Sequence, residues 1–218
     1  MPFVTHLAEN PEMNQADLER LLKDPKAAFE FRILRATRRL LARKGLSISV
    51  DEIAEEAEVG RRTVFRYFES RDELVARALD ESLDRFYTSV TETSAVDMPL
   101  ADWLANIVGA LHSQQLAAGA GLWQLAATQD EDLPAPIAKI NRKRRASRKK
   151  STGQISDAAW ARAGGTGGAP HDVEIAFANA ISAFTVQSMH RDYGATFDEA
   201  TRVVADTLHA YLVAKVAR

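Results

Sequence analysis

The sequence predicts an all-α protein, because helical periodicity runs through most of its 218 residues and no run of alternating β-branched residues interrupts it. Three short motifs mark helix beginnings, each with a serine or threonine followed three residues later by glutamate, which is the pattern of a capping box. They are Ser49–Glu52, Ser70–Glu73 and Thr196–Glu199. Glycines and prolines separate the other apolar stripes, so we expect about nine helices.

Composition narrows the class of protein before any binding motif is considered. Hydrophobic residues make up 46% of the chain, which is enough for a sizeable core. Cysteine is absent, which excludes a disulfide, a thiolate metal site and a cysteine nucleophile. The first ten residues do not resemble a signal peptide, and the uncharged stretch 103–129 has too many amides and glycines for a membrane span. We expect a cytoplasmic protein without a metal or a cofactor.

The distribution of charge and the positions of helix-breaking residues divide the chain into three parts. Residues 1–23 are expected to form a polar N-terminal arm, residues 24–80 a small helical domain, and residues 81–218 a larger helical domain. The net charge is −2, yet the segment 24–80 holds 12 basic against 11 acidic residues. Nucleic-acid binding needs a basic face rather than a basic total, so the net charge does not exclude that class of protein.

Two short helices joined by a tight turn are predicted between residues 49 and 68. Ser49 caps the first helix, and the second, which begins after Gly60, is rich in arginine. We expect Val64, Phe65 and Phe68 to pin the second helix onto the domain core, so that its arginines face outward. This arrangement is typical of a helix-turn-helix motif. The alternative is an ordinary helical hairpin with a solvated arginine face.

The outward side chains of the second helix suit different groups of DNA. A guanidinium can donate two hydrogen bonds to guanine O6 and N7 in the major groove, which distinguishes bases. Hydroxyl groups and further cations suit phosphates, which set register without reading sequence. The expected base-reading residues are Arg61, Arg62 and Arg66, and the expected phosphate-contacting residues are Ser49, Thr63, Tyr67 and Arg71.

This segment resembles the N-terminal domain of TetR/AcrR-family regulators over residues 50–74, which read VDEIAEEAEVGRRTVFRYFESRDEL. That family typically shows Ile-Ala, then Ala-Gly-Val-Ser, then Thr-Leu/Phe-Tyr/Phe-x-Tyr-Phe, then Ser-Lys-x-x-Leu, and the similarity extends over about residues 29–83. Two positions depart from the pattern. Glu58 replaces a glycine and would be strained at positive φ. Gly60 replaces a serine cap, at a cost of roughly a few tenths of a kcal/mol.

The resemblance implies a homodimeric transcriptional regulator that binds a palindromic DNA operator, and a repressor that a small-molecule effector releases. The alternatives are a DNA-binding regulator without an effector, or an enzyme that uses a C-terminal pocket. We expect no enzymatic activity, because no nucleophile–base pair and no dinucleotide motif is evident in the sequence. The last two long helices are expected to form an intersubunit four-helix bundle. The expected dimer contacts are Ile181, Val204, Leu208 and Tyr211.

The C-terminal domain is expected to enclose a largely apolar effector. The uncharged stretch 103–129 and a helix over residues 172–191, apolar nearly all round, combine large apolar side chains with a few polar groups, as ligand pockets do. A break at residues 119–121 would allow the pocket to change shape. A plain core is the alternative. The expected pocket residues are Trp103, Ile107, Leu111, His112, Trp123, Phe177 and Phe184.

A basic run occupies residues 139–150, with eight lysines and arginines and no acidic residue. We interpret it as the solvated face of a helix, as charge runs usually are. The alternative is a patch for acidic groups, such as the phosphates of an acyl-CoA, or for flanking DNA. The apolar stripe of this helix turns polar midway, so Arg144 is expected to approach the cavity.

Overall fold

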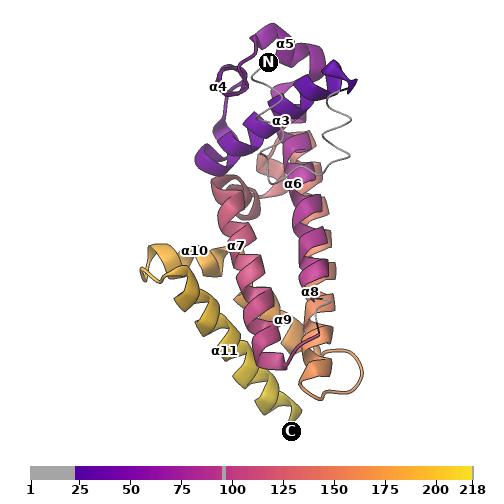
Figure 1. Ribbon diagram of the computed structural model, residues 1–218, viewed down its shortest axis with the longest axis vertical. Coiled ribbons are helices and arrows are strands. Elements are labelled where there is room, and N and C mark those ends of the chain that lie inside the picture. The colour runs from indigo at the N-terminus through magenta and orange to yellow at the C-terminus, as the bar shows by residue number, and fades with distance from the viewer. Residues whose placement is uncertain (1–22, 95–96, 218) are drawn as a thin grey trace.

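The computed structural model describes residues 23–94 and 97–217, and for residues 89–94 only their backbone. The polar arm expected over residues 1–23 therefore lies, except for Lys23, outside the described residues. Within the described ranges the chain has nine α-helices, two 3₁₀ turns and no strand, which confirms the all-α prediction (Figure 1). The elements are α3 (Pro25–Lys44), η1 (Gly45–Ser47), α4 (Val50–Glu56), α5 (Arg61–Tyr67), α6 (Arg71–Ser94), α7 (Leu100–Ala127), η2 (Asp130–Asp132), α8 (Ala135–Arg162), α9 (His171–Ala180), α10 (Ala183–Arg191) and α11 (Phe197–Val216).

Helices α3, α4 and α5 gather at one end of the molecule, above the long helices α6, α7 and α8 (Figure 1). Helix α3 begins as the sequence predicts, with the Asp24 carboxylate accepting a hydrogen bond from the Lys26 N–H at 2.8 Å. The apolar faces of the small helices meet in one core around Ile33, Ile53 and Val64, each at most 1% exposed. None of the helices in the described ranges is long and apolar enough to span a membrane.

Helix α6 joins the two expected domains without interruption. The boundary proposed between residues 80 and 81 falls inside this helix, which runs from Arg71 to Ser94. The core of the small domain also extends into the larger one, because Leu125 of α7 and Ile137 of α8 pack in the same buried cluster as α3 to α6. A shift of α6 or α7 is therefore transmitted to the helix-turn-helix through continuous packing.

The break expected at residues 119–121 is present as a kink inside α7. Gly119 has φ 59° and ψ −147°, and a Cβ there would lie 2.2 Å from the carbonyl oxygen of Ala42 in α3. Only glycine tolerates both this backbone conformation and this close approach. The kink therefore lets the end of α7 dock directly on α3.

The prediction of a single apolar helix over residues 172–191 is wrong. The chain forms two helices, because the Ser182 side chain accepts a hydrogen bond from the Thr185 N–H at 3.1 Å and caps α10. Helix α9 ends at Ala180, and the capped turn gives α10 a new direction (Figure 1). The two apolar faces are consequently not continuous: Phe177 is fully buried, whereas Ile175 is 55% exposed and Phe184 is 46% exposed.

The turn between α4 and α5 contains the strain that the sequence predicts. Glu58 has φ 53°, and the N–H of Val59 donates to the carbonyl of Ala54 at 2.9 Å across the helix end. This is the hydrogen bond of a Schellman motif, whose left-handed position normally holds glycine. Gly60 then caps α5 without a side-chain hydrogen bond.

We predict that Glu58→Gly increases the free energy of unfolding by about 1 kcal/mol, because it relieves the left-handed strain of a residue with a Cβ. Glu55→Gly, in the exposed interior of α4, is the matched control and should lower the free energy of unfolding by about 1 kcal/mol. Chemical denaturation measures both. Equal destabilisation by the two substitutions would contradict the strain at Glu58.

Candidate nucleic-acid interface and effector cavity

The entry of the helix-turn-helix is held by the predicted capping box at Ser49. The Ser49 hydroxyl accepts from the Glu52 N–H at 3.2 Å, and the Ser49 N–H donates to the Glu52 carboxylate at 2.7 Å. Hydrogen bonds from the Lys44 ammonium and from Ser49 lower the pKa of Glu52 to about 2. Glu52 is thus a fixed anion that orders the start of α4, while Ser49 remains exposed at the helix end.

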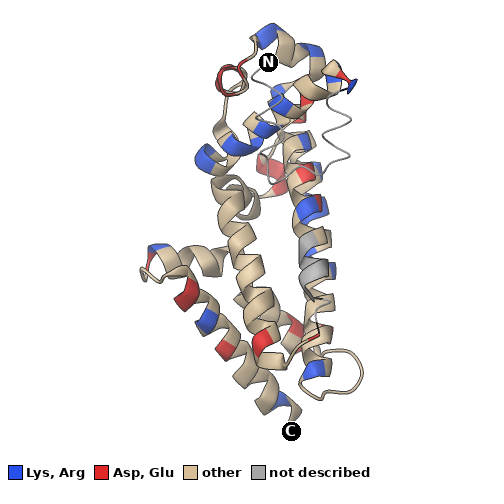
Figure 2. Ribbon diagram, in the orientation of Figure 1, with Lys and Arg blue, Asp and Glu red and all other residues tan. Residues whose placement is uncertain are grey.

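Three arginines of α5 lie on its exposed side, as expected. Arg61 donates to both carboxylate oxygens of Asp51, at 3.0 and 2.9 Å, and lies over the Phe65 ring. Arg66 stacks over Tyr67 with 5.1 Å between its guanidinium carbon and the ring centroid. Arg62 is exposed as well. Lysines and arginines line α3 and α5 at this end of the molecule, so a basic face exists despite the negative net charge (Figure 2).

The expected anchors of α5 are only partly correct. Val64 and Phe68 are 1% and 3% exposed and fasten the helix to the domain core. Phe65, expected beside them, is 44% exposed, because Tyr67 takes the inner place and stacks on Phe29 at 6.2 Å between ring centroids. Tyr67 therefore supports the helix and lies next to the expected interface at the same time.

Arg71 does not have the free guanidinium expected of a phosphate contact. Its Nε donates to the carbonyl of Ile48 at 2.9 Å, Nη2 bonds to the carbonyl of Leu46, and Nη1 pairs with Asp72 at 2.6 Å. The preceding loop offers carbonyl groups that α4 cannot satisfy, and the arginine fork fits them. In this structure Arg71 positions the loop that leads to Ser49, and its phosphate contact stays a prediction.

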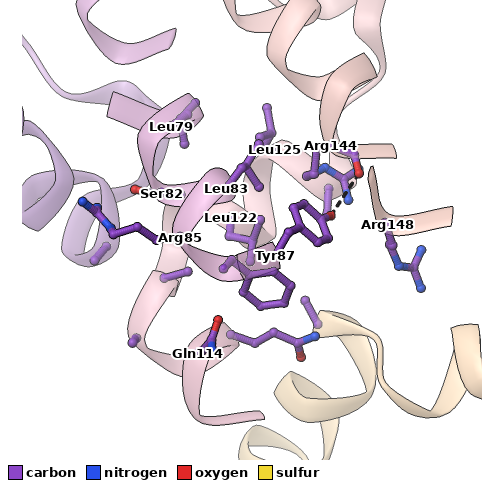
Figure 3. A pocket seen from close by; sticks show the side chains of 18 of the residues that line it. Leu79, Ser82, Leu83, Arg85, Tyr87, Gln114, Leu122, Leu125, Arg144 and Arg148 are labelled. Atoms are coloured by element: carbon purple, nitrogen blue, oxygen red, sulfur yellow. Dashed lines mark hydrogen bonds between the residues drawn. The ribbon is translucent and has the colours of Figure 1, made fainter. Parts of the chain in front are cut away.

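A cavity of about 760 Å³ lies between α3 of the small domain and the larger domain, and it is bordered by α3, α6, α7, α8 and α10. Its apolar side chains, including Leu83, Leu122 and Leu125, occupy the middle of the view in Figure 3. Tyr87 crosses the space and donates from its hydroxyl to the main-chain carbonyl of Arg144 at 3.1 Å. Burial of this phenol raises the pKa of Tyr87 to about 12, so it remains protonated.

Only two of the seven expected pocket residues, Leu111 and Phe184, line this cavity. Trp103, Ile107 and Phe177 are at most 1% exposed in a separate core between α7, α8, α9 and α11, and His112 is also fully buried. Trp123 is 36% exposed and meets the edge of the Phe184 ring at 6.3 Å. The expectation was wrong because apolar periodicity identifies buried side chains without telling a solid core from a cavity wall.

Most polar residues of the cavity were not predicted from the sequence. Arg144, which was expected near the cavity from its position in the stripe of α8, does line it. The other residues of the basic run 139–150 are divided between the cavity and the outer surface of the helix. Lys143 pairs with Asp80 and Asp84 outside, at 2.6 and 2.8 Å, whereas Arg144 and Arg148 line the cavity one turn apart. The spacing i, i+4 was the available signal. The residues not anticipated are Arg35, Arg38, Arg39, Arg85, Tyr87, Gln114, Arg148, Ser151 and Thr152.

Three of the four expected dimer contacts are buried within their own chain, and the dimer interface itself stays a prediction. Ile181, Val204 and Leu208 are 6%, 4% and 2% exposed in the core of their own chain, where α11 packs against α7. The Tyr211 hydroxyl donates to Asp172 of α9 at 3.1 Å. The large apolar side chains of α11 that are exposed are Phe197, Val203 and Val213, at 37%, 49% and 50%. The inner apolar stripe of α11 is thus buried against α7 within the single chain.

Residues 33–78, from α3 into α6, match the family model described as bacterial regulatory proteins, tetR family. A tetR-family transcriptional regulator from Streptomyces coelicolor has a similar structure, with a TM-score of 0.66 and 17% identity over 87% of this chain and 88% of that one. GusR from Salmonella enterica gives 0.64 and 22% over 88% and 97%. FadR from Bacillus subtilis, solved with stearoyl-CoA, gives 0.60 and 16% over 84% and 97%. No curated protein matches the sequence.

The match over residues 33–78 confirms the resemblance to TetR-family regulators expected from residues 50–74. The matched residues include α4 and α5, the two helices of the predicted helix-turn-helix. The described residues as a whole have the fold of the solved TetR-family structures.

His112 is the least satisfied polar group of the larger domain. It is fully buried on α7, and neither ring nitrogen has a hydrogen-bond partner among the described residues. Burial, and to a smaller extent the charge of His190, lowers the pKa of His112 from 6.5 to about 4. The folded protein therefore holds this imidazole neutral at pH values where the unfolded chain binds a proton.

We predict that the His112 contribution to stability is complete above pH 6.5 and is lost as the pH falls from 6.5 towards 4. His112→Leu should flatten this part of the stability profile, measured by denaturant titrations at a series of pH values. His171→Gln is the control, because the side chain of His171 is 84% exposed and does not pack in the core. An unchanged slope in His112→Leu would contradict the assignment.

Proposed function

We propose that the protein is a homodimeric repressor that binds a palindromic operator and is released from it by a small molecule in the cavity. The observation that carries the proposal is the place of the cavity, whose wall includes Leu41 and Ala42 of α3, the helix on which the helix-turn-helix is built. A ligand there lies against the DNA-binding domain itself. The proposed location is the cytoplasm, where a bacterial operator is found.

The proposed DNA interface is the exposed face of α5 with the N-terminus of α4. Arg62 and Arg66 would donate to base edges in the major groove, as recognition helices do. Arg61 would first leave Asp51, with which it pairs at 2.9 Å; both side chains are more than half exposed, so little energy opposes the exchange. Ser49, Thr63 and Tyr67 would contact phosphates.

A short chain of contacts supports the proposed coupling between cavity and DNA. After the Gly119 kink, Gln124 of α7 reaches the corner between α3 and η1 and accepts a hydrogen bond from the Leu46 N–H at 2.6 Å. The Leu46 carbonyl in turn bonds to Arg71, which orders the loop before α4. Displacement of this part of α7 by a ligand would move that loop. A difference of 1.4 kcal/mol in ligand affinity between the two states suffices for about tenfold weaker DNA binding.

The solved relatives support the effector role. FadR from Bacillus subtilis has the same fold and was solved with stearoyl-CoA, so this architecture can enclose a large ligand. A cavity volume of about 760 Å³ in the present chain is within the range of roughly 300–1,000 Å³ for small-molecule sites. A regulator without an effector would not require a cavity of this size.

We predict that Arg62→Ala and Arg66→Ala each relax the base preference at one position of each half-site, by roughly 1–3 kcal/mol of discrimination. Selection of bound duplexes from a randomised library, with the full chain at fixed salt, measures the preference. Ser49→Ala should instead weaken binding to all sequences alike.

Arg142→Ala is the matched control for this experiment, because Arg142 is exposed on α8 and should leave both affinity and preference unchanged. The assignment of α5 as the recognition helix fails if the base preference survives in both arginine variants. The proposal of DNA reading fails altogether if no sequence is enriched by the unmodified protein.

For the dimer, we propose that the outward apolar face of α11, which carries Val203 and Val213, packs against the same face of a second chain. Val203→Asp would bury a carboxylate near the two-fold axis and should raise the dimer dissociation constant at least about thirtyfold, from a loss of roughly 2 kcal/mol. Light scattering after size-exclusion chromatography measures it. Ala146→Asp, exposed on α8, is the control, and equal dissociation constants for the two variants would refute this interface.

A further inference from the structure

The cavity joins an apolar wall to an unusually cationic one. Six arginines line it and no aspartate or glutamate does, although the chain as a whole is acidic. The arginines come from α3, α6 and α8, so helices far apart in the sequence contribute charge of one sign. Arg38 is balanced by Glu81 at 2.8 Å, but Arg144 and Arg148, the two arginines of α8 that line the cavity, pair with no carboxylate of the described residues.

Arg144 is the decisive residue of this wall. Arg144 is only 8% exposed, and it forms no ion pair with any of the described residues. Its Nε donates to the side-chain oxygen of Asn141 at 2.9 Å, and this is the one donor of its guanidinium with a partner in the described part of the chain. Burial without an anion disfavours the charged form and lowers the pKa of Arg144, which nevertheless stays protonated.

The nearest carboxylate is already committed elsewhere. Asp130 accepts from Arg145 at 2.5 Å and from the Asn141 amide at 3.0 Å, on the outer side of α8. Asn141 is therefore held between Arg144 and Asp130 and presents only its amide oxygen to the arginine. The fold keeps the Arg144 guanidinium oriented without neutralising it.

Arg148 extends the same cationic surface by one helical turn. One of its Nη groups donates to the carbonyl of Ala178 in α9, which fixes the side chain, and no carboxylate of the described residues pairs with it. Figure 3 shows Arg144 and Arg148 on one side of Tyr87, with Leu83 and Leu122 on the other. An occupant of the cavity thus meets a fixed pair of guanidinium groups beside a leucine-rich wall.

We propose that the effector is an amphiphilic anion, whose carboxylate or phosphate group is bound by Arg144 and Arg148 and whose apolar chain lies against Leu83, Leu122 and Leu125. The inference rests on the proposed role of the cavity as the effector site and specifies the ligand that it takes. Guanidinium groups bind carboxylate and phosphate through paired hydrogen bonds.

The sequence predicts a largely apolar effector without fixing its charge, and physical chemistry favours an anionic over a neutral one. A buried charge is costly unless it is paired, and a neutral ligand would remove the remaining water from Arg144 without replacing its hydrogen bonds. An anion would pair with the Arg144 guanidinium and so offset the free-energy cost of burying it. The charge of the two arginines thus selects an anionic head group. The leucines bury the apolar chain of the ligand, and the buried area increases with the length of that chain.

The binding experiment uses the full-length protein and four twelve-carbon probes below the concentration at which they form micelles. Dodecanoate and dodecyl phosphate carry the two candidate anions, dodecan-1-ol is the neutral control, and dodecyltrimethylammonium is the cationic control. Isothermal titration calorimetry should give dissociation constants at least tenfold lower for one or both anions than for the two controls. The ratio between the anions identifies which head group fits.

Arg144→Met tests the residue directly, because methionine keeps an apolar side chain of similar reach and removes the unpaired charge. We expect it to lose at least tenfold in affinity for the anions, to keep its affinity for dodecan-1-ol, and to melt at the same temperature as the unmodified protein or higher. Arg148→Gln should lower the affinity for the same anions. Arg142→Met, outside the cavity on the same helix, should change none of these values.

The proposal is overturned if the alcohol binds as tightly as the anions, if Arg144→Met binds the anions unchanged, or if no probe binds. Release of the selected operator duplex is measured with the same probes and separates this inference from the proposed function. An anion that binds through Arg144 without releasing DNA would leave the ligand class standing and refute the effector role. DNA release by dodecan-1-ol alone, or by the ammonium compound alone, would support the effector role of the cavity and refute the proposed ligand class.

Discussion

The contact between the kinked end of α7 and the end of α3 is the constraint on which the rest of the structure depends. At Gly119 the helix comes so near to Ala42 that a Cβ would overlap its carbonyl oxygen, and at Gly45 a Cβ would overlap the Gln124 side chain, 2.2 Å from its oxygen. Both glycines also have positive φ. Because neither helix can move closer or carry a side chain there, the position of the helix-turn-helix is set by its contact with the larger domain.

This contact also explains why the cavity lies where it does. The kink turns the last part of α7 towards α3, and the space left between α3, α6, α7 and α8 is the cavity. The arginines of α3 and α8 then face a common volume although more than 100 residues separate Arg35 from Arg144 in the sequence. A ligand that neutralises one side of this volume changes the electrostatic balance on a helix of the DNA-binding domain.

Two polar groups of this chain are buried at a cost to the stability of the folded state. Arg144 is buried with only an amide as partner, and His112 is buried with no partner among the described residues. Each group lowers the stability of the folded state relative to an apolar residue of similar size. Arg144 has a compensating use in the proposed ligand site, whereas the structure shows no comparable use for His112. Unsatisfied polar groups of this kind are concentrated in the larger domain, whose shape is proposed to change.

Local sequence determined the features that depend on local interactions: the capping boxes at Ser49 and Thr196, the strained position of Glu58, the break at Gly119, and the exposed arginines of α5. Each rests on hydrogen bonds or backbone geometry within a few residues, so the pattern alone predicts it. The cavity and the outward face of α11 depend on which helix covers which, and periodicity marks a buried face without naming its partner. For that reason Trp103 and Val204 proved to be core, and Arg35, Arg144 and Arg148 became one site only through the packing of α3 against α6, α7 and α8.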